Sequence, residues 1–135
     1  AASDVYKRQD YKRIYDNSAI KDQIRGRASY TTLKDTMSDD KDGRKAAIAA
    51  TIVEMEEKKF TSKKTGEQET FCKITLQQNN DMAELVIWPE EYRNARALLV
   101  GAKNKLIICM AQVKYSDYVG HNNLQMTRNN LFEII

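Results

Sequence analysis

Residues 82–92, with the sequence MAELVIWPEEY, decide the fold, because a strand pattern passes there into a helix pattern. The first seven residues suit a β-strand, in which successive side chains point to opposite faces. Glu84, Val86 and Trp88 share one of these faces, and the apolar residues between them share the other. We expect Trp88 to pack in the core against the helix that follows.

A short helix is expected to begin at Pro89, because proline ends a strand and is well suited to the first helical position. Tyr92, Ala95 and Leu99 recur at helical spacing and form one apolar stripe. Gly101 follows them and is a suitable helix stop. One helix therefore interrupts a series of strands.

Two further segments on each side of this helix have strand patterns. Residues 46–55, AAIAATIVEM, are apolar with small residues in the middle, where a strand that bends around a barrel needs little bulk. Residues 70–76, TFCKITL, alternate between two faces, residues 105–115 are apolar on both faces, and residues 123–129 complete the set. Three strands, one helix and two strands are the element order of the OB-fold. We therefore predict an all-β protein, a five-stranded OB-fold barrel with one helix between strands 3 and 4.

The N-terminal part of the chain has a different composition. Residues 1–44 are predicted to be an N-terminal extension that is partly helical or disordered, and residues 45–135 are predicted to be the OB-fold domain. Apolar residues such as Tyr11, Ile14 and Tyr15 suit short amphipathic helices, but they are too sparse to form a core of their own.

Charge and cysteine content restrict the function only broadly. The chain has 22 Lys and Arg against 19 Asp and Glu, and this net charge of +3 does not by itself indicate a nucleic-acid partner. No apolar run approaches the roughly 20 residues that cross a membrane, and none suits a signal peptide. Cys72 and Cys109 lie in apolar strand runs without metal-binding spacing, so we expect two reduced core residues. These features predict a cytoplasmic protein with no membrane partner.

Catalytic and metal-binding motifs find little support. A calcium loop beginning at Ser38 would need a glutamate at its last position, where the chain has Ala49. His121, the one histidine, shares a single loop with Ser116 and Asp117, whereas a catalytic triad needs rigid supports. We therefore expect a non-catalytic chain without a metal or a small-molecule cofactor.

A lysine-rich loop is the strongest candidate for a ligand site. Residues 58–66, KKFTSKKTG, join the first two predicted strands and combine four lysines with one aromatic ring. Proteins bind single-stranded nucleic acid with cations along the backbone and aromatic faces that stack on bases. OB-folds use strands 2 and 3 and the flanking loops for this purpose, although Glu54, Glu56 and Glu57 beside the loop would repel phosphate. The predicted nucleic-acid-binding residues are Lys58, Lys59, Phe60, Lys63, Lys64, Phe71, Lys73, Tyr115, Tyr118 and Arg128.

Residues 65–66, 72–76 and 83–92 resemble the OB domain in the C-terminal part of the alpha subunit of bacterial DNA polymerase III, including its phage-encoded relatives. The likeness covers residues 32–135 and departs from the family at Lys73, where an aromatic residue is usual on the binding face. The resemblance implies a single-stranded DNA-binding module of a replicative polymerase, without the polymerase's catalytic centre. Other replisome subunits would then be further partners.

Two alternatives remain open. The first is a protein-interaction OB domain in a replication complex, in which the lysines only keep the surface soluble, because a fold does not dictate a function. The second is an RNA-binding or anticodon-binding OB domain, since the anticodon-binding domains of class II aminoacyl-tRNA synthetases belong to the same broad family. A comparison of RNA and DNA of one sequence separates this alternative from DNA binding.

Overall fold

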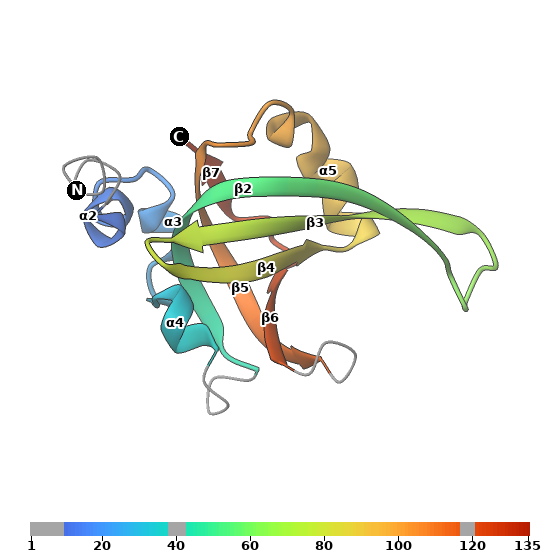
Figure 1. Ribbon diagram of the computed structural model, residues 1–135, viewed down its shortest axis with the longest axis horizontal. Helices are drawn as coiled ribbons and strands as arrows, with labels where there is room; N and C mark the ends of the chain where they lie inside the picture. Colours follow the sequence, from blue (N-terminus) through green and yellow to red (C-terminus); the bar gives the residue numbers. More distant parts are fainter. Residues whose placement is uncertain (1–9, 38–42, 117–120) are drawn as a thin grey trace.

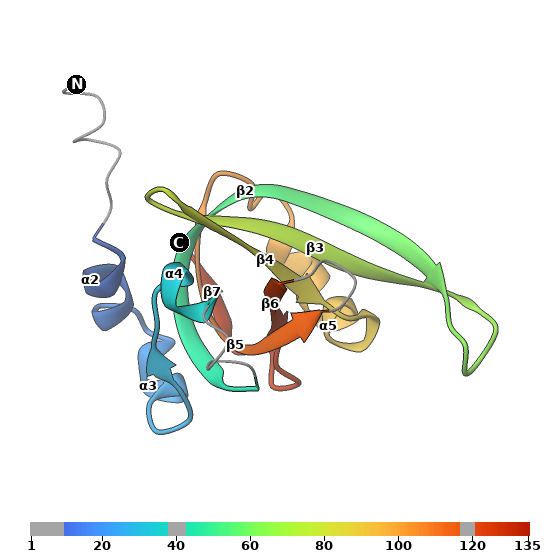
Figure 2. The same cartoon turned by 60° about the horizontal axis from the view of Figure 1, so that its bottom comes forward.

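A single curved β-sheet forms the body of the molecule, as Figure 1 and Figure 2 show from two directions. The computed structural model describes residues 10–37, 43–116 and 121–135. Within these residues seven strands lie in the order β1-β2-β3-β4-β6-β5-β7, and β2 also pairs with β5. The strands are β1 (Ser29–Tyr30), β2 (Lys45–Thr61), β3 (Gln68–Gln78), β4 (Asp81–Ile87), β5 (Leu106–Ser116), β6 (His121–Met126) and β7 (Phe132–Ile134). The helices are α2 (Tyr11–Asp16), α3 (Lys21–Ile24), α4 (Leu33–Thr36) and α5 (Pro89–Leu99).

Five of the strands pair in a ring. Antiparallel pairs join β2 to β3, β3 to β4, β6 to β5 and β5 back to β2, and a short parallel pair joins β4 to β6. These strands and α5 follow one another in the order that the sequence predicted. The predicted number of strands was wrong, because β1 adds to β2 and β7 adds to β5. Both extra strands have two or three residues, which is too short for a periodic pattern.

Strand β2 is longer than predicted and serves two partners. Its first half pairs with β5, and its second half continues past β5 and pairs with β3. Lys58, Lys59 and Phe60 were predicted to lie in a loop, but they belong to this strand. We call residues 54–61 of β2 and residues 68–75 of β3 the arm, and it projects on the right of Figure 1.

A β-bulge in β2 decides which side chains of the arm face outward. Ile52 pairs with Leu76, whereas Glu54 pairs with Thr75, so Val53 is an extra residue on the β2 side. An extra residue reverses the alternation of side chains between the two faces. Even-numbered residues of β2 therefore face the core before the bulge and face outward after it.

Helices α2 and α3 pack on the outer face of β2 and β5. Tyr11, Tyr15 and Ile24 form a buried cluster there with Ala47 and Ala49 of β2. The small residues of β2 were expected to ease a bend in the strand. The two that point outward instead leave space for the helices, because a larger side chain would occupy the volume that the tyrosines fill.

A second and larger cluster fills the interior of the sheet and includes both cysteines. Cys72 and Cys109 are free and buried, as predicted. Burial raises the pKa of the Cys72 thiol to about 11 and that of the Cys109 thiol to about 12. Both thiols are therefore inert core groups at neutral pH.

The described helices are all too short or too polar to span a membrane. In residues 10–37, 43–116 and 121–135, no group of three or more His, Cys, Asp or Glu side chains is placed to hold a metal ion. Most of the acidic turn that we compared with a calcium loop, residues 38–42, lies outside the described residues.

Candidate nucleic-acid interface

The outer face of the arm brings together residues that the sequence predicted for binding. Lys58 pairs directly with Phe71 across the ladder, and Phe60 pairs with Glu69. Residues opposite one another in an antiparallel pair lie on the same face of the sheet. Lys58, Phe60 and Phe71 therefore share one surface.

Three aromatic rings form the centre of this surface, and we call Phe60, Phe71 and Trp88 the platform. The ring centroids lie 5.7 Å apart for Phe60 and Phe71, 5.3 Å apart for Phe71 and Trp88, and 6.3 Å apart for Phe60 and Trp88. The two phenylalanines are half-buried, and Trp88 is 40% exposed. These distances are typical of interacting aromatic pairs, so the rings support one another and still present a surface to a ligand.

The position of Trp88 corrects an expectation from the sequence. We expected it in the core against α5, but the apolar stripe of this helix, Tyr92, Ala95 and Leu99, fills that space. Trp88 instead shares the outer face with Glu84, because the alternation of β4 continues to the residue before the helix.

Two lysines flank the platform and are held by ion pairs. Lys73 lies 3.3 Å from Glu84, and Lys58 lies 3.7 Å from Glu56. Both pairs are partly exposed to solvent, where such a contact contributes only about 0–1 kcal/mol. A phosphate group can therefore replace either carboxylate at low energetic cost.

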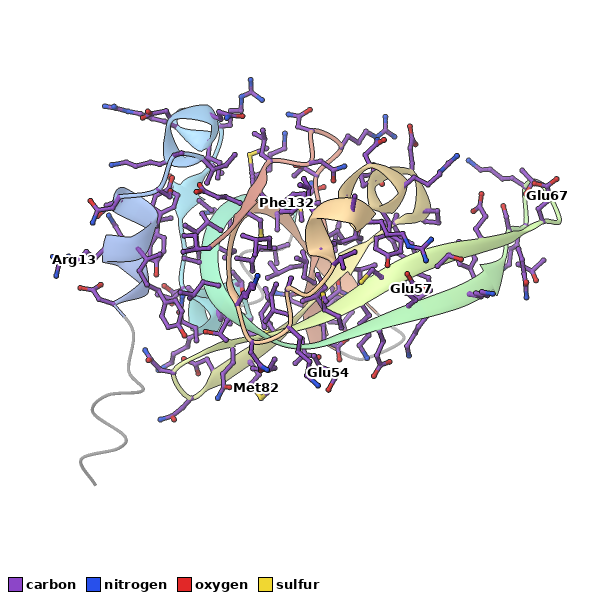
Figure 3. All side chains as sticks on the ribbon, turned by 90° about the horizontal axis from the view of Figure 1, so that it is seen from above. Arg13, Glu54, Glu57, Glu67, Met82 and Phe132 are labelled. Atoms are coloured by element: carbon purple, nitrogen blue, oxygen red, sulfur yellow. The ribbon has the colours of Figure 1, made fainter. Side chains whose placement is uncertain are left out.

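The turn of the arm presents two further lysines. Lys63 and Lys64 are exposed in a turn that is closed by hydrogen bonds from the Gly66 N–H to the Ser62 carbonyl and from the Ser62 N–H to the Glu67 carbonyl. Gly66 has a φ of 72°, a conformation that favours glycine. The turn therefore holds the two lysines at the tip of the arm, where Figure 3 labels Glu67.

Other predicted residues are not brought to the platform. Lys59 pairs with Thr70 and lies on the opposite face of the arm. Tyr115 is exposed near the end of β5 and alternates with the neighbouring Lys114, which lines the outer face. Tyr118 lies outside the described residues. The predicted site therefore divides between the platform, the tip of the arm and separate positions.

The inner face of the arm is attached to α5. The Tyr92 hydroxyl donates a hydrogen bond to the Glu57 carboxylate, and the same carboxylate lies 3.2 Å from Nε of Arg96. Burial and the hydrogen bond to Glu57 raise the pKa of Tyr92, so its hydroxyl stays protonated and keeps donating. Figure 3 shows Glu57 where the arm passes this helix. These contacts hold the arm and its outer face in one orientation relative to the body.

A groove of about 780 Å³ begins at the platform and continues over the outer face of the sheet. Trp88 forms part of one wall, Gln112 and Gln125 lie along the sheet, and Arg128 lines the groove rather than extending the track of arm lysines. The groove contains both signs of charge. Its cations are Lys45, Arg93, Lys114 and Arg128, and its acids are Glu69, Glu90 and Glu91.

Sequence reasoning missed Trp88 and most of the groove. The alternation of β4 already placed Trp88 with Glu84 and Val86, and the charge of Glu84 was a usable signal that this face meets solvent. Lys45 and Lys114 gave no such signal, because they are 69 residues apart in the sequence of a chain rich in lysine. Only the pairing of β2 with β5 brings their strands together.

Comparisons with known proteins concern the fold. No protein-family model matches the chain, and no curated protein matches its sequence.

Solved structures of similar fold include two separate OB domains. The OB domain of Ta0387 from Thermoplasma acidophilum has a TM-score of 0.58 and 10% identity, over 80% of this chain and 88% of that one. The second OB-fold domain of replication protein A from Methanococcus maripaludis has a TM-score of 0.51 and 19% identity, over 70% and 86%. RecG bound to a three-way DNA junction has a TM-score of 0.57 and 19% identity over 78% of this chain, which matches only 12% of RecG. The chain therefore has the OB-fold that its element order predicted.

Proposed function

We propose that this chain is a non-catalytic module that binds single-stranded DNA on the outer face of the arm. The observation that carries the proposal is the exposed platform of Phe60, Phe71 and Trp88 with lysines beside it. Aromatic stacking on bases contributes roughly 1–3 kcal/mol per base and tolerates any sequence. A duplex keeps its bases stacked on one another, so only a single strand can use the platform.

Two further observations support the proposal. The fold is similar to an OB domain of replication protein A and to part of RecG, whose structure contains a DNA junction. The residues that resemble the OB domain of the polymerase III alpha subunit include residues 83–92, which contain Trp88 and the start of α5. We therefore propose a replicative polymerase as the setting of the module.

Fluorescence anisotropy of labelled oligonucleotides tests the proposal. We expect the full chain to bind a single strand more tightly than the duplex of the same sequence, with an affinity that falls as salt increases, because released counterions contribute to binding. An RNA of the same sequence shows whether the 2′-OH matters. Equal, salt-independent signals for single and double strands would remove the proposal.

Charge reversal at the tip of the arm tests the role of the lysines. Lys63→Glu combined with Lys64→Glu should weaken binding and lower its salt dependence, since both side chains are exposed next to the turn. The matched control is Arg13→Glu combined with Arg25→Glu, because both residues are exposed and Arg13 lies at the opposite end of the molecule from Glu67 in Figure 3. A tip variant that binds DNA as the unmodified chain does, while it still captures a protein partner, would favour a protein-interaction domain instead.

A further inference from the structure

The groove beside the platform has a continuous row of side chains along the sheet. Val86 of β4 pairs with Gln125 of β6, and Gln125 pairs with Gln112 of β5. Gln112 then pairs with Lys45 of β2. Because paired residues share one face, these side chains line the outer surface from one strand to the next. Trp88 follows Val86 by two residues on the same face, so the row begins at the platform.

The cations of the groove differ from those of the arm. Lys58 and Lys73 on the arm are held by Glu56 and Glu84. Among the residues that the structure describes, no carboxylate lies within 4.0 Å of the charged nitrogens of the four groove cations. A phosphate that meets an unpaired cation displaces only mobile counterions, and that release favours binding. The four groove cations, which have no carboxylate partner among the described residues, are Lys45, Arg93, Lys114 and Arg128.

The balance of charge changes along the groove. Glu90 and Glu91 occupy the first turn of α5, directly after Trp88, and Glu69 lies on the arm. Lys45 and Lys114 come from β2 and β5, at the other end of the row. The platform end therefore offers rings to bases and carries both signs of charge, since Arg93 lies on α5 with the two glutamates, whereas the far end carries cations that attract phosphates.

The middle of the row is polar and uncharged. The Gln112 side-chain amide donates a hydrogen bond to the Gly43 carbonyl at 3.1 Å, which fixes this side chain, and Gln125 beside it is half-buried. An amide offers both a donor and an acceptor. These two side chains can therefore contact base edges or sugars without requiring one particular sequence.

We propose that the groove is a second segment of the binding site, in which the DNA backbone leaves the platform and crosses β6 and β5 to reach Lys45 and Lys114. This inference rests on the proposed function. Three strand spacings of about 4.8 Å give a path of roughly 14 Å from β4 to the start of β2. A strand that covers only the three rings does not reach the two lysines, whereas a longer one does.

The dependence of affinity on oligonucleotide length tests the inference. Trp88 is the one tryptophan of the chain, so quenching of its fluorescence reports directly on the platform. We would titrate oligothymidylates of about 4 to about 16 nucleotides, the range of site sizes of single OB-folds. The unmodified chain should gain affinity and salt dependence with length, whereas Lys45→Ala combined with Lys114→Ala should lose most of that gain. Two lost phosphate contacts lower the salt slope for a single strand by about 1.4, or about sevenfold in affinity for a fourfold change in salt.

Controls separate this inference from the proposed function. Arg13→Ala combined with Arg25→Ala removes the same charge from exposed residues that do not line the groove and should change neither the length dependence nor the salt slope. Thermal melting shows whether the groove variant is folded. If the alanine variant is unfolded, Lys45→Gln combined with Lys114→Gln is used in its place. If the groove variants keep the full gain with length while Phe60→Ala with Phe71→Ala weakens binding, the second segment is wrong and the platform stands. If no oligonucleotide binds the unmodified chain, both proposals fail.

Discussion

The outer surface of the sheet carries two aromatic clusters, and they differ in what covers them. Tyr15 of α2 and Tyr30 of β1 lie 5.4 Å apart between ring centroids, and Tyr15 packs between its helix and the sheet and is 6% exposed. The rings of the platform are spaced similarly, but no described helix covers them, and Trp88 is 40% exposed. Similar side chains therefore serve the core in one region and form a surface in the other. The comparison separates residues that stabilise the fold from residues available to a ligand.

The largest effect is expected in the covered region. Ile24→Ala removes the fully buried side chain that α3 packs into the cluster on β2 and β5, and it should lower the free energy of unfolding by about 2–5 kcal/mol. Urea denaturation measures the change. The fraction that remains folded should bind single-stranded DNA with normal affinity, and a parallel loss of binding would show that the two regions are not independent.

Trp88→Ala should weaken DNA binding more than it lowers stability, which is the opposite of Ile24→Ala. Loss of one stacking surface should weaken single-strand binding by about 1–3 kcal/mol, or roughly 5-fold to 150-fold. Its effect on unfolding should be smaller than that of Ile24→Ala, because the ring is already 40% exposed. Anisotropy and urea denaturation on the same preparation give both values, and a variant that loses stability but not affinity contradicts the distinction.

Ala49→Leu tests whether the packing of α2 and α3 on β2 depends on small residues. The side chain is fully buried beneath α2 and α3, so the added volume should cost about 1–3 kcal/mol of stability. Hydrogen exchange should accelerate in residues 11–24 before it does in the arm. Unchanged protection of these helices from hydrogen exchange would mean that their contact with β2 is not close-packed.

Tyr92→Phe tests the attachment of the arm to α5. Loss of the hydrogen bond to Glu57 should cost roughly 0.5–1.5 kcal/mol. The folded-state pKa of Tyr92 is raised, so its contribution to stability is present below the unfolded pKa of 10.0 and is lost as pH rises through the folded pKa. The variant should therefore lose less stability than the unmodified chain between neutral and strongly alkaline pH. Equal alkaline losses in the two proteins would contradict this role.

The smallest expected effect is a gain in affinity for single-stranded DNA. Glu84→Gln frees Lys73 from its ion pair and removes a negative charge beside the platform, so single-strand affinity should rise by about 1 kcal/mol or less at low salt. The gain should vanish at high salt, where the charges are screened. Weaker binding at low salt would show that the carboxylate orients Lys73 for the ligand.

The sequence predicted the features that depend on residues close to one another in the chain. Alternation identified the inward residues of β3 and β4, and the Pro89 boundary placed α5 correctly. The groove could not be predicted in this way, since its residues come from five separate elements that meet only after the strands have paired. The exposure of Trp88 depends on which side chains fill the space above α5, and alternation alone left that choice open.

Because Val53 is an extra residue in β2, the number of residues in this strand matters more than their types for the directions of the side chains on the arm. Deleting it would turn Phe60 and Lys58 toward α5 and bring Glu57 and Lys59 to the outside, without replacing any of these side chains. An insertion of one residue nearby would do the same. Combining the deletion with such an insertion would restore the original directions of the side chains. Among homologous chains that keep the ligand surface, gaps at this position should therefore be rarer than substitutions.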